Sequence, residues 1–176
     1  VGINLNSACK SDFTKIYAGS AGTDSYTNAI SDVYQDNFEE AIFTGKGIYN
    51  VKVFSDVLKD EIPENTVLSH DLLEGSYLKC GLASDIMLMD GYPTSYLSFK
   101  TRLSRWSRGD IQILRWIRKK IKNREESQKD NPLNIVSKYK ILNNLVRIIF
   151  PPLVFLGIVL LILLGRFVNA KIWPIM

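Results

Sequence analysis

Two arginines and a tryptophan, Arg102, Arg105 and Trp106, have a spacing suited to binding a charged sugar substrate. In a helix, residues at positions i, i+3 and i+4 lie on one face. Guanidinium groups donate forked hydrogen bonds that fit phosphate oxygens, and an indole ring offers a flat face to a sugar or a cation. The spacing therefore predicts a site for a diphosphate leaving group or for a glycan acceptor beside a membrane.

Asp71 is the candidate general base. It follows the short apolar run Val67-Leu68 and the pair Ser69-His70. A carboxylate at a strand end, beside a polar cleft, can deprotonate a hydroxyl group. The same carboxylate can instead cap the helix expected from Leu72, and the residues alone favour neither role. His70, the chain's single histidine, is more simply a packed or surface residue than a proton shuttle.

A short glycine segment, Gly45-Lys46-Gly47-Ile48-Tyr49, is a further candidate. Two glycines around a lysine mark a place where the backbone turns or approaches another group closely. Asp85 and Asp90 can either bind a divalent ion or end a strand, and we favour the second reading. No spacing typical of a metal site occurs in the sequence, so no residue is predicted to bind a metal.

The apolar pattern predicts alternating helices and strands. We expect one long basic helix that carries Arg102 and breaks at Gly109, followed by a polar linker. The remaining expected elements are strands at 1–5 and 83–89 and helices at 51–58 and 72–81, with the long helix at 95–121 and the linker at 123–134.

Charge is divided unevenly along the 176 residues, whose net charge is +4. Residues 1–99 hold 6 basic and 14 acidic side chains, whereas residues 100–124 hold 10 basic and one acidic. A basic segment between an acidic body and an apolar tail is typical of a juxtamembrane region that faces anionic headgroups. Nucleic acid can bind such a segment, but the apolar tail makes membrane lipid the simpler partner. Cys9 and Cys80 are expected to be free thiols.

The tail contains 18 uncharged residues, 148–165, which is long enough for a membrane-spanning helix. Residues 135–147 have helical apolar spacing and are expected to lie in the headgroup plane, and 166–176 begin a possible second span. More Lys and Arg precede the first span than follow it, which predicts that the preceding part is cytoplasmic. We therefore expect a multi-pass protein of the inner or plasma membrane, and a chain that is a piece of a longer polypeptide.

Four blocks of sequence, in this order and spacing, resemble membrane-bound family 2-like glycosyltransferases, the group that includes cellulose, chitin and hyaluronan synthases. The resemblance is greatest to the cyclic β-1,2-glucan synthase type. Two positions depart from the pattern: Asn50 stands where an acidic residue is expected, and Ile111 where an aromatic one is expected. The blocks are TDSYTNAISDVYQD, FTGKGIYNV, PENTVLSHDLLEG and RLSRWSRGDIQILRW.

This resemblance implies the C-terminal half of a GT-A-like α/β domain that uses a UDP-sugar, with UDP-glucose the first candidate. Asp71 would be the base of an inverting transfer to a growing glucan, and Arg102, Arg105 and Trp106 would bind diphosphate and acceptor. His70 and the segment Gly45–Tyr49 would line the acceptor side. Mg²⁺ or Mn²⁺ is implied as well, with ligands expected upstream of this chain, which is therefore expected to be inactive alone.

The expected organisation is a catalytic part at 1–124, a linker and interfacial helix at 125–147, the span at 148–165, and the second apolar segment. Its partners would be a nucleotide sugar, a glucan acceptor, membrane lipid and the rest of its own polypeptide, and not nucleic acid. The alternative is a non-catalytic, membrane-anchored module whose basic segment binds anionic lipid or a protein partner.

Overall fold

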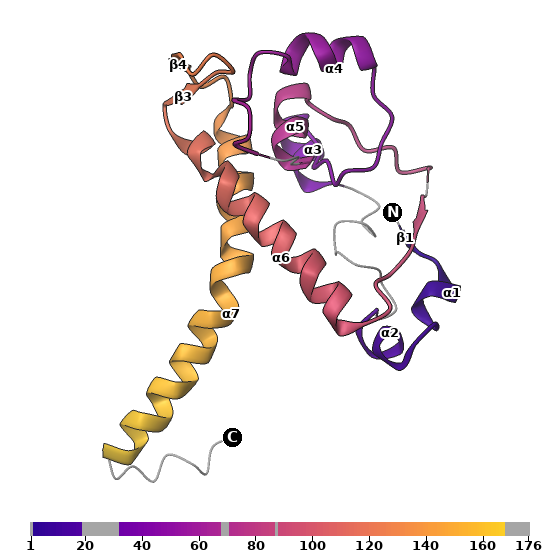
Figure 1. Cartoon of the computed structure of the whole chain (residues 1–176), viewed down its shortest axis with the longest axis vertical. Helices are drawn as coiled ribbons and strands as arrows, with labels where there is room; N and C mark the ends of the chain where they lie inside the picture. The colour runs from indigo at the N-terminus through magenta and orange to yellow at the C-terminus, as the bar shows by residue number, and fades with distance from the viewer. Residues whose placement is uncertain (1, 19–31, 68–70, 87, 168–176) are drawn as a thin grey trace.

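The computed structural model describes residues 2–18, 32–67, 71–86 and 88–167. Helices dominate this part of the chain, and its strands are only two or three residues long (Figure 1). In chain order the elements are β1 (Gly2–Ile3), α1 (Leu5–Ala8), α2 (Asp12–Tyr17), α3 (Val33–Phe38), α4 (Val51–Leu58), α5 (Asp71–Leu78), β2 (Met89–Asp90), α6 (Tyr96–Gln112), the 3₁₀-helix η2 (Ile113–Ile117), β3 (Lys120–Lys122), β4 (Gln128–Asp130) and α7 (Ile135–Phe167).

The two strands β1 and β2 pair in parallel, with Gly2 opposite Met89 and Ile3 opposite Asp90. The strand predicted at 83–89 is wrong except for its last residue, because a turn occupies Ser84 and Asp85. Serine and aspartate favour turns, since their short side chains hydrogen-bond nearby backbone. The pairing fixes Asp90 at the end of a strand, which agrees with the structural reading of this residue.

Aromatic rings hold the start of α6 against α2. Ser95 caps α6 by accepting a hydrogen bond from the backbone N–H of Ser98 at 3.3 Å. Phe13 of α2 lies at the centre of the ring cluster, with centroid distances of 4.6 to 6.4 Å. Stacked and edge-on ring pairs of this kind add to the burial of apolar area. Its neighbours are Tyr17, Tyr92, Tyr96 and Phe99.

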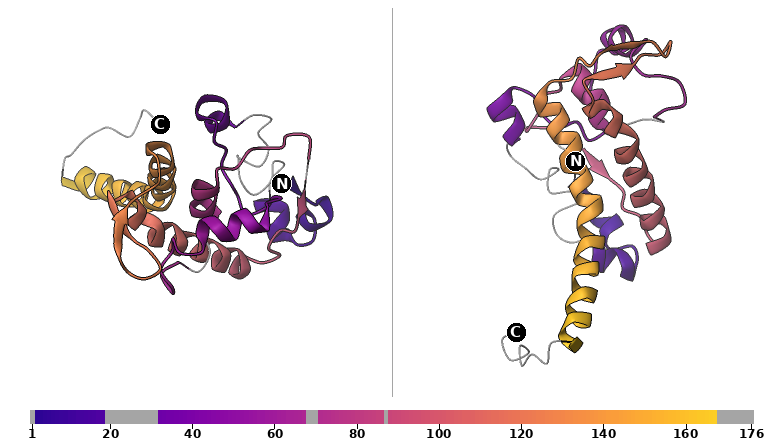
Figure 2. Two further views of the ribbon diagram at one scale, coloured as in Figure 1. Left: turned by 90° about the horizontal axis from the view of Figure 1, so that it is seen from above. Right: turned by 90° about the vertical axis from the view of Figure 1, so that its left-hand side faces the viewer.

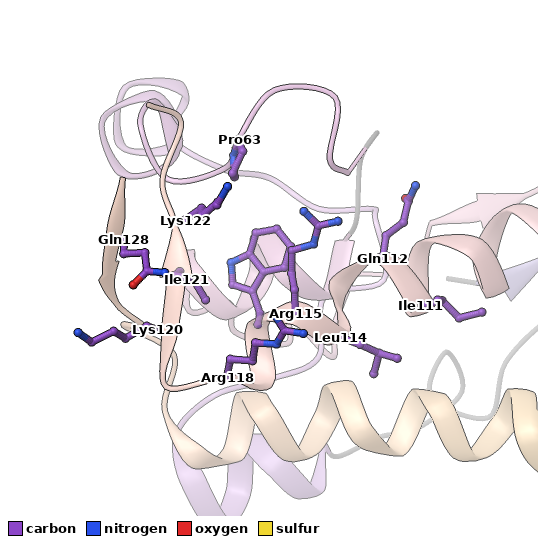
Figure 3. Close-up of a pocket in the computed structure, with 11 residues that line it drawn as sticks. Pro63, Ile111, Gln112, Leu114, Arg115, Arg118, Lys120, Ile121, Lys122 and Gln128 are labelled. Atoms are coloured by element: carbon purple, nitrogen blue, oxygen red, sulfur yellow. The ribbon is translucent and has the colours of Figure 1, made fainter. Parts of the chain in front are cut away.

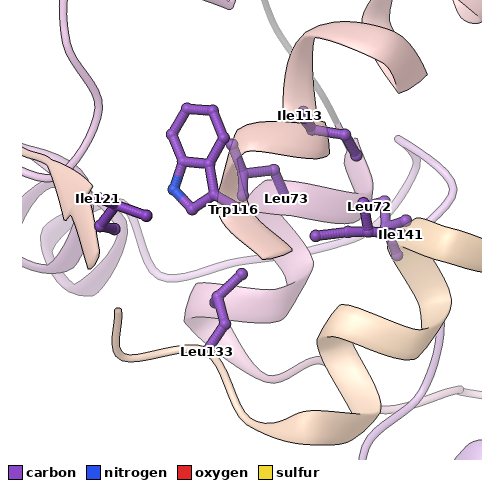
Figure 4. Close-up of a cluster of buried hydrophobic side chains, with 7 residues drawn as sticks. All are labelled: Leu72, Leu73, Ile113, Trp116, Ile121, Leu133 and Ile141. Atoms are coloured by element: carbon purple, nitrogen blue, oxygen red, sulfur yellow. The ribbon is translucent and has the colours of Figure 1, made fainter. Parts of the chain in front are cut away.

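The hydrophobic core joins α5, η2, β3 and α7 (Figure 4). Trp116 is fully buried at its centre, and its indole N–H donates to the Tyr77 hydroxyl at 3.0 Å. The predicted break at Gly109 is wrong: α6 continues to Gln112 and then tightens into η2, which turns Ile113 and Trp116 into the core. The cluster consists of Leu72, Leu73, Ile113, Trp116, Ile121, Leu133 and Ile141.

An antiparallel hairpin, β3–β4, joins the end of the predicted long helix to the segment predicted as a linker, with Lys120 opposite Asp130. The helix predicted to reach residue 121 therefore ends earlier, and the predicted linker 123–134 contains β4. The Asn123 side chain closes the turn of the hairpin by accepting from the backbone N–H of Ser127 at 2.8 Å. Only Ile121 of β3 is buried, so the sequence lacks the apolar alternation by which strands are recognised.

Helix α7 is continuous from Ile135 to Phe167, so the predicted interfacial helix and the predicted span are one helix (Figure 2). Its first half packs against α5, α6 and η2, and its second half stands apart from the other elements. Within the described residues, it is the one helix long and apolar enough to cross a membrane, over Ile135–Leu164. Pro151 and Pro152 lie inside it, as membrane helices tolerate. Most of the possible second span, 168–176, lies outside the described residues.

Two buried acids attach the first half of α7 to the rest of the fold. Glu40 accepts from the Lys140 ammonium group at 3.1 Å and from the Ser137 hydroxyl at 2.8 Å. Asp110 of α6 pairs with Arg147 at 3.0 Å. Cys9 and Cys80 are free thiols, as predicted.

Candidate active site

Asp71 is the first residue of α5, and its side chain is half-buried. The next two residues, Leu72 and Leu73, are buried in the core and hold the start of the helix in place. The structure therefore puts Asp71 inside the first helical turn instead of at the capping position before it. The amide dipoles at a helix N-terminus favour the charged form of a carboxylate there.

The backbone of Gly45 lies directly against the Asp71 carboxylate. A β-carbon added at Gly45 would overlap the Asp71 carboxylate oxygens, and the residue has a φ of +87°. Both features require glycine at this position. Phe43 packs closely on α5: a β-carbon added at Gly75 would lie 2.6 Å from the β-carbon of Phe43. The glycine segment and α5 thus form one unit around Asp71.

Lys46 links the same segment to β2. Its ammonium group pairs with the Asp90 carboxylate at 2.5 Å. The hydrogen bond from Lys46 is the main cause that lowers the pKa of Asp90, followed by the Gly91 backbone N–H, and the charge of Arg102 contributes. The Lys46–Asp90 pair therefore connects the glycine segment, which contacts Asp71, to the end of β2.

Arg102 and Trp106 lie on one face of α6, as predicted. The Arg102 guanidinium lies over the Trp106 ring, 5.6 Å from its centroid, and the indole is 42% exposed. A cation held on a ring in this way is oriented without losing its hydrogen-bond donors. Arg105 is exposed on the same helix and makes no ion pair with the residues that the structure describes.

Tyr49 and Gly47, also predicted site residues, contact other aromatic side chains. Tyr49 is exposed, and its ring packs on Phe54 of α4 with 4.9 Å between centroids. The backbone of Gly47 approaches the Phe43 ring, so that a β-carbon added at Gly47 would lie 3.0 Å from it. His70 falls outside the described residues.

Sequence reasoning missed the part that Asp90 plays in the site. It predicted that Asp90 ends a strand, but not that this carboxylate pairs with Lys46. A charge pair between residues 44 positions apart leaves no local signal in a single sequence. The only hint is an aspartate followed by glycine at the end of an apolar run.

The described residues do not form a metal site. No three His, Cys, Asp or Glu side chains among them lie close enough together to hold an ion. Asp90, the carboxylate nearest to such a role, is already paired with Lys46. The described residues therefore offer no complete ligand set for the Mg²⁺ or Mn²⁺ implied by the resemblance.

Comparison with known proteins shows that the chain is similar to a glucan synthase. The relative is the cyclic β-(1,2)-glucan synthase NdvB of Rhizobium meliloti (strain 1021), and 141 residues, 80% of this chain, are 43% identical to it. This similarity confirms the resemblance inferred from the sequence blocks. The chain spans about 5% of the length of that relative. No protein-family model matches the chain.

Proposed function

We propose that this chain forms part of an inverting glycosyltransferase that moves a hexosyl group from a UDP-sugar, UDP-glucose first, to a growing glucan. The observation that carries the proposal is the contact of the Gly45 backbone with the carboxylate of the half-buried Asp71, together with the pair that the next residue, Lys46, makes with Asp90. Such a transfer requires a base, a cation that can bind phosphate and a surface for the acceptor sugar, and we assign these roles to Asp71, Arg102 and Trp106. The similarity to a glucan synthase supports the same reaction.

In this mechanism the carboxylate of Asp71 takes the proton from an acceptor hydroxyl group. The hydroxyl oxygen forms a bond to C1 of the donor sugar from the face opposite the diphosphate, and the bond from C1 to the diphosphate oxygen breaks. UDP leaves with that electron pair, so negative charge grows on its terminal phosphate. Attack from the opposite face inverts the configuration at C1.

Arg102 and Arg105 offset the charge on the leaving diphosphate, and Trp106 supports the acceptor sugar. One oriented donor of this kind contributes roughly 3–4 kcal/mol to transition-state stabilisation. His70 and the segment Gly45–Tyr49 line the acceptor side. Lys46 is held at the edge of this region by Asp90.

The proposed setting is the cytoplasmic face of the inner or plasma membrane. The basic residues before the span favour that orientation, and α7 is the anchor. The GT-A-like fold, further spans and the metal-binding residues belong, in this proposal, to the longer polypeptide. The steps assigned to Asp71 and Arg102 need no metal contact from this chain.

Arg102→Gln in the full-length protein tests the proposal. The rate of UDP release from UDP-glucose is expected to fall about 100-fold or more, because the leaving group loses a charged donor. Arg108→Gln is the matched control, since it removes the same charge from an exposed position on the same helix. Its rate is expected to stay within about threefold of wild type. Equal losses in both variants would refute a specific role for Arg102.

A further inference from the structure

An open pocket of about 680 Å³ lies between the end of α6, η2 and the β3–β4 hairpin (Figure 3). Four basic side chains line it, and no acidic side chain does. Leu114 and Ile121 contribute apolar surface between them. We call this site the basic pocket and define it by Arg115, Arg118, Lys120 and Lys122.

Three glutamates near the basic pocket already have cationic partners. Glu64 pairs with Arg124 at 2.6 Å, and Glu126 pairs with Lys122 at 3.4 Å. Glu61 pairs with Lys129. Arg115, Arg118 and Lys120 make no ion pair with any described residue, and Lys120 lies opposite Asp130 in the hairpin. The pocket lining itself carries only positive charge, and such a surface attracts anions.

The pocket is built on a fixed scaffold. The Asn131 side chain donates to the carbonyl oxygens of Trp116 and Arg118 at 2.5 and 2.9 Å, which ties the hairpin to η2. Trp116 and Ile121 are buried beneath it. The backbone that carries the cations is therefore organised before any ligand binds, which lowers the entropic cost of binding.

The position of the basic pocket argues against headgroup contact for residues 115–124, the last part of the basic segment 100–124 that was predicted to face the membrane. The hairpin β3–β4 and η2, which line the pocket, lie near the N-terminal end of α7, away from the half that stands apart (Figure 1). The uncharged stretch begins at Ile148, 13 residues after Ile135, which is about 20 Å along a helix. The pocket is also separate from the candidate active site, because Arg102 lies ten residues before the end of α6, about 15 Å along its axis.

We propose that the basic pocket binds a soluble, phosphate-bearing small molecule with two or more phosphate groups. Arg115 and Arg118 can each grip a phosphate in forked geometry, and Lys120 adds a point charge. Leu114 supplies apolar surface for the rest of the ligand. Two pocket-lining residues, Trp116 and Ile121, belong to the hydrophobic core that also contains residues of α5 and α7. A ligand bound here can therefore stabilise the packing of these helices without entering the active site.

Calorimetric titration of the full-length protein in detergent with inorganic pyrophosphate, without divalent metal, tests this proposal. The Arg102→Gln background weakens phosphate binding at the candidate active site and is expected to leave binding at the basic pocket unchanged. Adding Arg118→Gln and Lys120→Gln is expected to weaken that binding at least tenfold. Adding Lys10→Gln and Lys119→Gln, which removes equal charge from exposed residues that do not line the pocket, is expected to change it less than twofold.

Arg115→Gln, from η2 instead of the hairpin, is a second variant with the same expected direction, so damage to the hairpin alone cannot explain a loss. Pyrophosphate binding that both pocket variants leave unchanged would overturn the proposal. A titration with monomeric dihexanoylphosphatidylglycerol separates the two phosphate sources. Tighter binding of this lipid than of pyrophosphate, lost in the same variants, would overturn the assignment to a soluble ligand.

Discussion

At Gly45 the backbone itself forms part of the candidate site. The residue combines a φ of +87° with direct contact to the Asp71 carboxylate, so any side chain there displaces the proposed base. A glycine in such a place has a chemical role as well as a conformational one.

Gly45→Ala is therefore expected to reduce UDP release from UDP-glucose at least tenfold, since its methyl group competes with Asp71 for space. Gly81→Ala is the matched control, because a β-carbon there would lie 3.6 Å from the Gln35 side chain, an ordinary contact. The control is expected to keep near-normal activity. Normal activity of Gly45→Ala would show that Asp71 does not need its present position.

Single residues of the site were predictable to the extent that their partners are close in sequence. Arg102 stacks on Trp106 because they are four positions apart on a helix, and this spacing is visible in the sequence. The contact of Gly45 with Asp71 and the pair Lys46–Asp90 depend on how loops return through space, which no periodicity encodes.

At the scale of elements, α7 depends on a buried charge cluster. Glu40 is 2% exposed and receives hydrogen bonds from Lys140, Ser137 and Asn134. Removing one member of a buried pair leaves the other without compensation, at a cost of several kcal/mol.

Glu40→Gln is expected to lower the stability of the full-length protein by about 3 kcal/mol, because Lys140 stays buried without its counter-charge. Thermal unfolding in detergent measures this loss. Asp12→Asn removes an acid from the exposed pair Lys15–Asp12 and is expected to change the unfolding temperature little. Equal effects of the two substitutions would contradict the anchoring role of Glu40.

The buried cluster around Glu40 also predicts that the stability of the protein depends on pH. Burial alone would raise the pKa of Glu40, but the hydrogen bonds from Ser137, Asn134 and Lys140 outweigh it and lower that pKa. A lowered pKa stabilises the fold at pH values above the usual glutamate range, and this contribution disappears as pH falls through the lowered value. The unfolding temperature of the wild type is therefore expected to fall once the pH drops below the usual glutamate range, and to be independent of pH near neutrality. Glu40→Gln should show a shallower drop, and an equally steep one would exclude Glu40 as its source.

Helices were predicted correctly where an apolar face or a capping residue defined them. The helix predicted at 51–58 is α4, and Asn50, the departure from the family pattern, caps it by accepting from the N–H groups of Lys52 and Val53 at 3.0 and 3.2 Å. An aspartate would make the same bonds, so asparagine preserves the cap. The hairpin and η2 escaped prediction because tertiary packing of Trp116 and Ile121, not local pattern, defines them.

At the scale of the whole molecule, β1 and β2 form a sheet of only two strands within the described residues. A two-residue parallel pair is too small to be stable in isolation, and Ile48 and Val51 are 96% and 73% exposed beside the site. Since the chain spans about 5% of its relative, we propose that other parts of a longer polypeptide cover these surfaces and supply the donor site.

The central claim is that Asp71 is the base of a glycosyl transfer, and UDP release from UDP-glucose by full-length protein carrying Asp71→Asn tests it most directly. Loss of a general base is expected to slow release by about 10²- to 10⁴-fold, with membrane association unchanged. Asp56→Asn, at an exposed position of α4, is expected to behave as wild type. Release at the wild-type rate by the Asp71→Asn protein would contradict the assignment and favour a non-catalytic, membrane-anchored module.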